Sequence, residues 1–224
     1  MSRTCQEELQ CPVCGGRQEV KVWASVNVTL DPPLRESVLD GTLNRFHCSS
    51  CGAEFGIERD LLYHDMKRHL YIWLKYPDDA GRFGVDPAAT ALFSALPQAP
   101  TVRVVPSYEE LVEKILIAEA GLDDLEVELI KFMVSVAQQI DLTQPMFFSH
   151  IGSAPPSSRT AVLAVPVGEE VRYIEYPLDR FEEGRERTLA KLRALPPEKD
   201  ACPYLCRTYV LRLLERAGLG RRLA

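Results

Sequence analysis

Alternating hydrophobic and polar residues predict long β-strands in the first third of the chain. In residues 18–30, valine recurs on one face, while polar residues and Trp23 occupy the other. Residues 69–76 alternate leucine and isoleucine with Tyr71 and Trp73. Successive side chains of a strand point to opposite sides, so each stretch predicts a strand with one buried face.

A short helix and a hairpin are expected between these two strands. Asp31, followed by proline, is typical of a helix start, because aspartate caps free amides and proline fits the first turn. Gly41 is expected to end this helix. Residues 43–47 and 53–57 predict the two arms of a hairpin. Together these elements predict an antiparallel β domain over residues 1–80.

The second half of the chain has a different pattern. Residues 81–106 are rich in proline, alanine and glycine, which predicts a linker. Beyond it we expect the order αα-ββ-αα, with helices at 107–120, 125–139, 180–195 and 201–217 and strands at 160–167 and 171–176. The helix at 125–139 is apolar almost all round, which predicts that it lies at the centre of this half. The expected fold class is therefore α+β, with a second domain over residues 107–224.

Composition indicates a folded protein outside the membrane. Hydrophobic residues make up 46% of the chain, yet no stretch approaches the ~20 uninterrupted apolar residues of a membrane span. The formal net charge is -6, so no global positive field would attract nucleic acid. Only residues 180–224 are locally basic, with 11 basic and 6 acidic residues. The first ten residues are polar and acidic rather than signal-like, so we expect a cytoplasmic protein.

Two Cys-x-x-Cys pairs predict a metal site. Cys11 and Cys14 form the first pair, and Cys48 and Cys51 form the second. Each pair is followed by glycine, which allows the positive φ that closes such a turn. Four thiolates in tetrahedral geometry suit Zn²⁺ and leave it no open position. The expected cofactor is one structural zinc ion, and hairpins that each carry one cysteine pair make the first domain zinc-ribbon-like.

The cysteine pairs are also compatible with other chemistry. Iron in a site of the rubredoxin kind uses the same ligands, and the sequence leaves that metal open. Disulfides are disfavoured because the chain begins without a recognisable secretion signal. A thioredoxin-like redox site needs only one such motif, beside a βαβ pattern that the sequence does not show.

Several short motifs resemble the CpXC family, which is named for its cysteine pairs. They are the two Cys-x-x-Cys pairs, Trp23-x-Ser25-Val26-Asn27, Asp31-Pro32, Gly41-x-x-Asn44 and Leu62-Tyr63-His64-Asp65-Met66. The second pair departs from the family name, because Ser50 stands where proline is expected, but proline only stiffens the turn. The resemblance implies Cys11, Cys14, Cys48 and Cys51 as the metal ligands and supplies no catalytic residues.

A few other residues suggest chemistry but have a simpler explanation. His64 beside Asp65 resembles an oriented base, yet a hydrogen-bonded structural histidine is the expectation. Cys202 and Cys206 are spaced to share one face of a helix, where core positions are expected. The acidic residues between 109 and 128 are expected on helix N-termini and solvent faces.

Three classes of function remain. The first is a protein-interaction module that presents Trp23, Tyr71 and Trp73 on the ribbon. The second is nucleic-acid binding through the C-terminal arginines, namely Arg207, Arg212, Arg216, Arg221 and Arg222. The third is an enzyme whose site lies in a cleft lined by His64, Asp65 or His150. The first is the preferred hypothesis, because the chain is acidic and no catalytic motif is recognisable.

Overall fold

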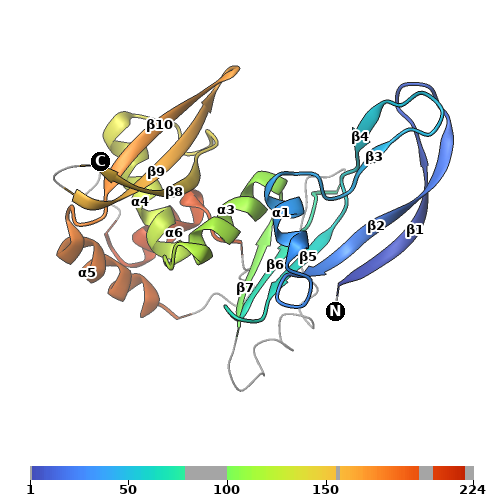
Figure 1. Ribbon diagram of the computed structural model, residues 1–224. Helices are drawn as coiled ribbons and strands as arrows, with labels where there is room; N and C mark the ends of the chain where they lie inside the picture. The colour runs from blue at the N-terminus through green and yellow to red at the C-terminus, as the bar shows by residue number, and fades with distance from the viewer. Residues whose placement is uncertain (1, 79–99, 155–156, 197–203, 220–224) are drawn as a thin grey trace. The chain divides into compact units, whose positions relative to one another are not determined.

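The computed structural model describes residues 2–78, 100–154, 157–196 and 204–219 (Figure 1). The chain divides into two compact units, Met1–Val112 and Glu113–Ala224. Both combine helices and strands, which confirms the α+β class. Within the described residues, no helix has the length and apolar composition of a membrane span.

The first unit contains a five-stranded sheet. Its strands, in spatial order, are β1 (Arg3–Gln10), β2 (Arg17–Asn27), β5 (Leu61–Asp65), β6 (Leu70–Leu74) and β7 (Thr101–Val105). Helix α1 (Pro33–Leu39) and the separate hairpin of β3 (Arg45–His47) and β4 (Glu54–Gly56) lie between β2 and β5 in the chain. The predicted helix and hairpin are therefore present.

The sheet is mixed rather than antiparallel. β1 pairs with β2, and β5 with β6, in antiparallel fashion, whereas β2 runs parallel to β5 and β6 runs parallel to β7. The expectation of an antiparallel domain is wrong for these two parallel pairs. Parallel neighbours need a long crossover connection, and hydrophobic alternation identifies the buried face of a strand but not its neighbour.

Strand β7 also corrects the predicted linker. Residues 101–105 were expected within that linker but form an edge strand of the first sheet. The division between units falls inside helix α3 (Tyr108–Glu119), not in the proline-rich segment. Most of that segment, residues 79–99, lies outside the described residues. A five-residue strand next to prolines gives too short a pattern to separate from an extended linker.

Burial follows the predicted alternation in the inner strands. Leu70, Ile72 and Leu74 on β6 are buried, while Tyr71 and Trp73 are only partly covered. The alternate valines of β2 are buried as expected. Strand β1 was not expected, because most of its residues are exposed and leave no hydrophobic alternation to recognise.

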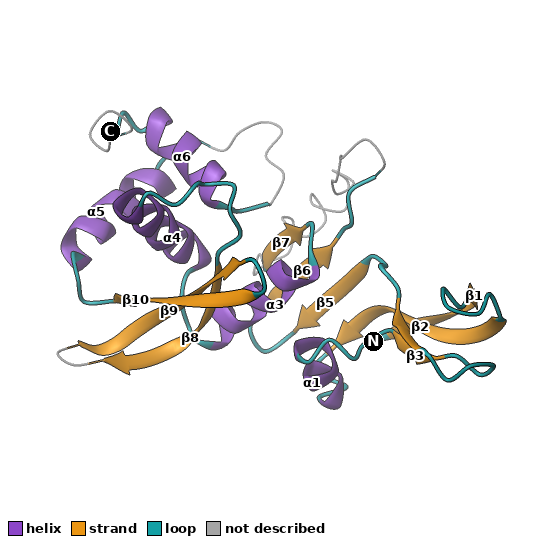
Figure 2. Ribbon diagram, turned by 90° about the horizontal axis from the view of Figure 1, so that it is seen from above, coloured by secondary structure: helices purple, strands orange, loops and turns teal. Residues whose placement is uncertain are grey.

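The second unit combines a three-stranded antiparallel sheet with helices (Figure 2). The strands lie in the order β10 (Glu170–Pro177), β9 (Ser157–Val167) and β8 (Phe147–Ala154). After α3 come α4 (Asp124–Gln138), α5 (Glu182–Arg193) and α6 (Arg207–Arg216). The predicted order lacked β8, whose pairing with β9 has two irregularities that break the alternation.

Helix α4 lies at the centre of this unit, as predicted. One side of the helix contributes Val127, Ile130 and Val134 to a core shared with the sheet. Another side contributes Leu129 and Phe132 to a core shared with α5 and α6. Its remaining buried positions are polar, namely Glu128, Lys131 and Ser135.

Candidate metal centre

Two hairpin turns carry the cysteine pairs. The first lies between β1 and β2 and the second between β3 and β4; each is called a knuckle below. The amide of Gly15 donates to the carbonyl of Cys11, and that of Gly52 to the carbonyl of Cys48, both at 2.9 Å. Both glycines have a φ of 73°, a conformation that is strained for residues with a Cβ. The spacing Cys-x-x-Cys-Gly therefore builds the same turn twice.

The four cysteine sulfurs form one cluster. The Sγ atoms of Cys11, Cys14, Cys48 and Cys51 all lie within 4.8 Å of one another. Across the knuckles, Cys11 Sγ lies 3.8 Å from Cys51 Sγ, and Cys14 Sγ lies 3.5 Å from Cys48 Sγ. A disulfide needs about 2.05 Å, whereas sulfurs placed tetrahedrally about 2.3 Å from a zinc ion lie ~3.8 Å apart. The cluster therefore fits one four-coordinate metal ion.

Backbone amides and neighbouring thiols shift the acidity of the sulfurs. In each knuckle the amide two residues after the first cysteine donates to its Sγ at 3.4 Å. The amides of Cys51 and Ser50 lower the pKa of Cys48 to about 6. At Cys51, the amide of Ala53 lowers the pKa, but hydrogen bonds among the thiols and burial outweigh it and raise the pKa to about 12. A bound cation would stabilise the additional thiolates.

Two residues near the cluster hold the knuckles in place. Gln18 on β2 donates to the carbonyl of His47 at 3.0 Å and accepts from the amide of Ser49 at 2.7 Å. These two hydrogen bonds connect β2 to the second knuckle. A Cβ on Gly16 would lie 2.9 Å from Ser50 Oγ, so the knuckles approach too closely for a side chain there. Neither role could be recognised from the sequence, because glutamine and glycine are not metal ligands of this kind of site.

The side chains of His64 and Asp65 lie on opposite faces of the sheet. The two residues are neighbours on β5, where successive side chains point to opposite faces. His64 Nδ1 lies 3.2 Å from Asn27 Nδ2, and its ring stacks on Tyr71 with centroids 3.9 Å apart. Asp65 is buried and pairs with Arg68 at 2.7 Å. Burial is the main cause that lowers the pKa of His64. His64 is thus a hydrogen-bonded histidine of the sheet, as expected, without a carboxylate to orient it.

His69, His150, Cys5 and Cys206 are not part of the sulfur cluster. His69 is exposed in the turn between β5 and β6, and His150 is exposed on β8 in the second unit. Cys5 is exposed on β1. Cys206 precedes the first residue of α6, so the expectation of a helical position is wrong for it. Cys202 lies outside the described residues.

The predicted basic helix presents fewer arginines than expected. Arg207 is only 6% exposed, and it donates to Ser135 Oγ at 2.8 Å and to the carbonyl of Gln144. Arg207 was one of the arginines named for the nucleic-acid alternative, but its guanidinium satisfies polar groups inside the unit rather than facing an external anion. Arg212 and Arg216 are exposed, while Arg221 and Arg222 lie outside the described residues.

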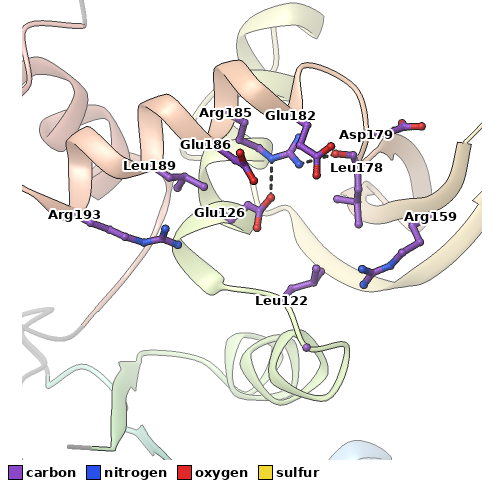
Figure 3. A pocket seen from close by; sticks show the side chains of 11 residues that line it. Leu122, Glu126, Arg159, Leu178, Asp179, Glu182, Arg185, Glu186, Leu189 and Arg193 are labelled. Carbon is purple, nitrogen blue, oxygen red and sulfur yellow. Dashed lines mark hydrogen bonds and ion pairs between the residues drawn. The ribbon is translucent and has the colours of Figure 1, made fainter.

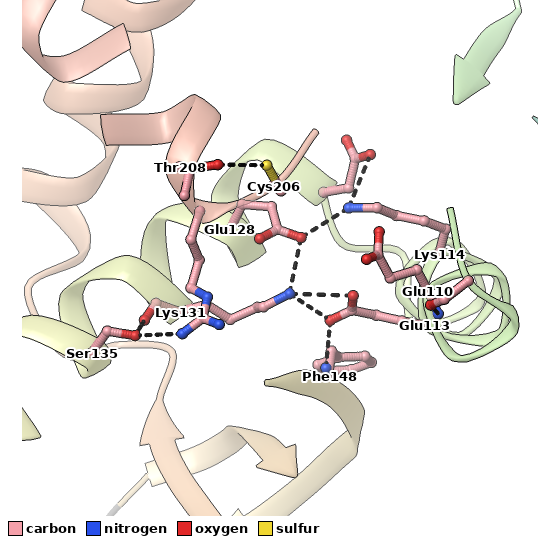
Figure 4. A network of polar contacts seen from close by, with 12 residues as sticks. Glu110, Glu113, Lys114, Glu128, Lys131, Ser135, Phe148, Cys206 and Thr208 are labelled. Atoms are coloured by element: carbon pink, nitrogen blue, oxygen red, sulfur yellow. Dashed lines mark hydrogen bonds and ion pairs between the residues drawn. The ribbon is translucent and has the colours of Figure 1, made fainter. Parts of the chain in front are cut away.

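A buried network of charges joins α3 and α4 (Figure 4). Lys131 Nζ lies 2.9 Å from Glu113 Oε1 and 3.0 Å from Glu128 Oε1, and Lys114 Nζ lies 2.9 Å from the same Glu128 oxygen. Glu113 also accepts from the amide of Phe148 on β8 at 2.6 Å. All four charged residues are at most 4% exposed. The expectation of a solvent face is wrong for Glu113 and Glu128, because charges on facing helices neutralise each other.

A polar cleft of about 550 Å³ opens on the second unit (Figure 3). It is lined by Gly121, Leu122, Glu126, Arg159, Leu178, Asp179, Glu182, Arg185, Glu186, Leu189 and Arg193. Arg185 is held there by Glu126 at 2.6 Å and by the carbonyls of Leu178 and Arg180. The residues named for the enzyme hypothesis, His64, Asp65 and His150, are not among those that line this cleft.

Comparison with known proteins gives one match. The family model described as CpXC protein matches residues 9–131, which include both knuckles, the strands β2 to β7 and the start of α4. No curated protein and no solved structure matches the chain.

Proposed function

This chain belongs to the CpXC family, whose model covers more than half of it, and we propose that it is a zinc-binding protein of the zinc-ribbon kind. In this proposal Cys11, Cys14, Cys48 and Cys51 hold one structural Zn²⁺. The observation that carries it is the separation of the sulfurs across the knuckles, 3.5 and 3.8 Å, which suits a tetrahedral zinc site. Four thiolates leave no open coordination position, so the ion stabilises the fold rather than activating water.

The size of the second hairpin also supports a structural ion. β3 and β4 contain three residues each and form a sheet of their own. A two-stranded hairpin is marginally stable by itself, whereas zinc binding contributes on the order of 10 kcal/mol to the folding of small zinc domains. We infer that the ion fixes this hairpin against β1 and β2.

Metal analysis tests the zinc proposal. Reduced protein, purified without added metal, is expected to contain one zinc ion per chain. Cys14→Ser and Cys48→Ser are each expected to lose most of it, because three thiolates no longer complete the site. Cys5→Ser is the matched control, since Cys5 is exposed on β1 and lies outside the cluster. Absence of metal from the unmodified protein would overturn the proposal, and the absorption bands of an iron-tetrathiolate centre would replace zinc with iron.

The biological role proposed here is that of a cytoplasmic protein-interaction module. A closed ligand set at the metal leaves no coordination position for a substrate, which favours binding over catalysis. The tip of the first knuckle offers Val13, which is 72% exposed. Photo-crosslinking from Val13 and, on α6, from Arg212 tests the role in cells. A discrete protein adduct is expected from one of these positions, and its absence from both would argue against the role.

A further inference from the structure

The two cysteines of each knuckle differ in exposure. Cys11 and Cys48, the first of each pair, are 2% and 3% exposed. Cys14 and Cys51, the second of each pair, are exposed. The same difference occurs in both knuckles, so it is a property of the turn. One edge of the sulfur cluster is therefore open to solvent while the other is covered.

Hydrogen bonding distinguishes the sulfurs further. The amide of Val13 donates to Cys11 Sγ, and that of Ser50 donates to Cys48 Sγ, each at 3.4 Å. A donated hydrogen bond stabilises negative charge on sulfur and makes it less nucleophilic. The two covered sulfurs are therefore also the two that these amides stabilise.

We propose that Cys14 and Cys51 form the reactive edge of the metal cluster, a modification site for soft electrophiles and peroxide. This inference rests on the proposed metal site and goes beyond it, because a structural role alone does not rank the ligands. All four ligands of a bound metal are thiolates, so access to the sulfur decides which of them react, and access selects Cys14 and Cys51.

The chemistry with hydrogen peroxide leads to a disulfide. The thiolate of Cys14 attacks one peroxide oxygen, the O–O bond breaks and hydroxide leaves, which gives a sulfenic acid. The thiolate of Cys48, whose Sγ lies 3.5 Å away, attacks that sulfur, forms the S–S bond and displaces a second hydroxide. The two sulfurs lose two electrons, the peroxide gains them, and two protons convert the hydroxides to water. Only two thiolates then remain, too few for a four-thiolate zinc site.

Isotope-coded alkylation of the unmodified full chain tests this order. The metal content is measured first. The folded protein then receives a short pulse of light iodoacetamide, and after unfolding the remaining thiols are labelled with heavy iodoacetamide. Peptide mass spectrometry gives the ratio of light to heavy label at each cysteine. Sulfur displaces iodide in each labelling step. Cys14 and Cys51 are expected to take the light label several-fold faster than Cys11 and Cys48. Cys5 serves as an internal exposed thiol outside the cluster. Zinc release, followed with a chromogenic indicator, is expected to parallel the labelling of Cys14 and Cys51.

The outcomes separate the two proposals. Equal or faster labelling of Cys11 or Cys48 would overturn the reactive edge even if one zinc ion is present. Protein without metal would overturn the zinc site, and the labelling order of that protein would still test the edge. In the peroxide experiment, a first disulfide between Cys14 and Cys48 is expected, because their sulfurs are the closer pair across the knuckles. A first disulfide that contains neither Cys14 nor Cys51 would overturn the proposal.

Discussion

Lys131 Nζ lies 2.9 Å from Glu113 Oε1 and joins α4 to α3 inside the second unit. Both side chains are buried. Removing one partner leaves the other charge buried without compensation, so we expect Lys131→Met to lower the free energy of unfolding by about 3–5 kcal/mol. Hydrogen exchange at the amide of Ile130, in the core of α4, is a suitable measurement. Tryptophan fluorescence would not report on this unit, because both tryptophans lie in the first.

A matched control for this prediction is Lys191→Met. Lys191 is an exposed lysine of α5, so its loss is expected to leave the exchange rate nearly unchanged. Adding Glu113→Gln to Lys131→Met is expected to recover part of the stability, because the orphaned carboxylate is then neutral. A cost for Lys131→Met no larger than that of the control would contradict the structural role of the network.

The same network predicts sensitivity to acid. Burial raises the pKa of Glu128, but Lys114 and Lys131 outweigh it and hold that pKa below its usual value. The stabilisation is therefore complete above the unfolded-state pKa of about 4.3 and is lost as the pH falls through the lower folded-state pKa. We expect the stability of the second unit, followed by hydrogen exchange, to fall as the pH drops below ~4.3.

A substitution can assign this acid sensitivity. Glu128→Gln is expected to flatten the dependence of stability on pH, at the cost of lower stability at neutral pH. Glu175→Gln is the control, since Glu175 is exposed on β10. An unchanged pH dependence in Glu128→Gln would show that other carboxylates govern acid unfolding.

Asn44 is expected to fix the start of the hairpin that bears the second knuckle. Its side chain accepts from the amide of Trp23 at 2.7 Å and donates to the carbonyl of the same residue at 3.0 Å. Its φ is 60°, in the left-handed region. Asn44→Ala loses both hydrogen bonds and adds strain, so we expect a loss of about 2–4 kcal/mol. Denaturant unfolding followed by tryptophan fluorescence measures it.

Asn44→Gly separates the two causes. Glycine accepts the left-handed conformation but makes no side-chain hydrogen bond. The loss for Asn44→Gly is therefore expected to be smaller than for Asn44→Ala. Equal losses would mean that backbone strain contributes nothing measurable.

Close approach of the knuckles predicts a pair of compensating changes. A Cβ on Gly16 would lie 2.9 Å from Ser50 Oγ and 3.3 Å from Ser50 Cβ. We expect Gly16→Ala to push the knuckles apart and weaken zinc binding in competition with a chelator. Combining it with Ser50→Gly removes those contacts and is expected to restore most of the affinity. If Ser50→Gly gives no recovery, the effect of Gly16→Ala has another origin.

Nucleic-acid binding is expected to be weak at physiological salt. Arg207 is buried, and among the described residues of α6 the exposed arginines are Arg212 and Arg216. Few phosphate contacts give low affinity and a shallow dependence on salt. Fluorescence anisotropy with random duplex and single-stranded probes measures this. Tight, salt-sensitive binding that is lost when Arg212, Arg216, Arg221 and Arg222 become Ala would favour a nucleic-acid protein instead.

The sequence by itself determined the features that are set by local spacing. The Cys-x-x-Cys-Gly repeats gave the two knuckles, because that spacing closes the same turn wherever it occurs. Alternation in 18–30 and 69–76 identified buried strand faces, and the all-round apolar pattern of 125–139 identified the central helix. In each case the physical cause acts within a few residues of the chain.

Only the tertiary structure decided which distant residues meet. Parallel pairing of β2 with β5 depends on the crossover between them, and the hydrophobic pattern of either strand does not indicate that crossover. From the sequence, the charged residues Glu113 and Lys131 are expected at the surface. In the folded protein, α3 and α4 pack together and the two charges neutralise each other. Arg207 is likewise expected on a basic face from the sequence, whereas in the structure it donates hydrogen bonds to Ser135 and Gln144. Burial of a charge depends on a partner far away in the chain, and hydrophobic patterning contains no information about that partner.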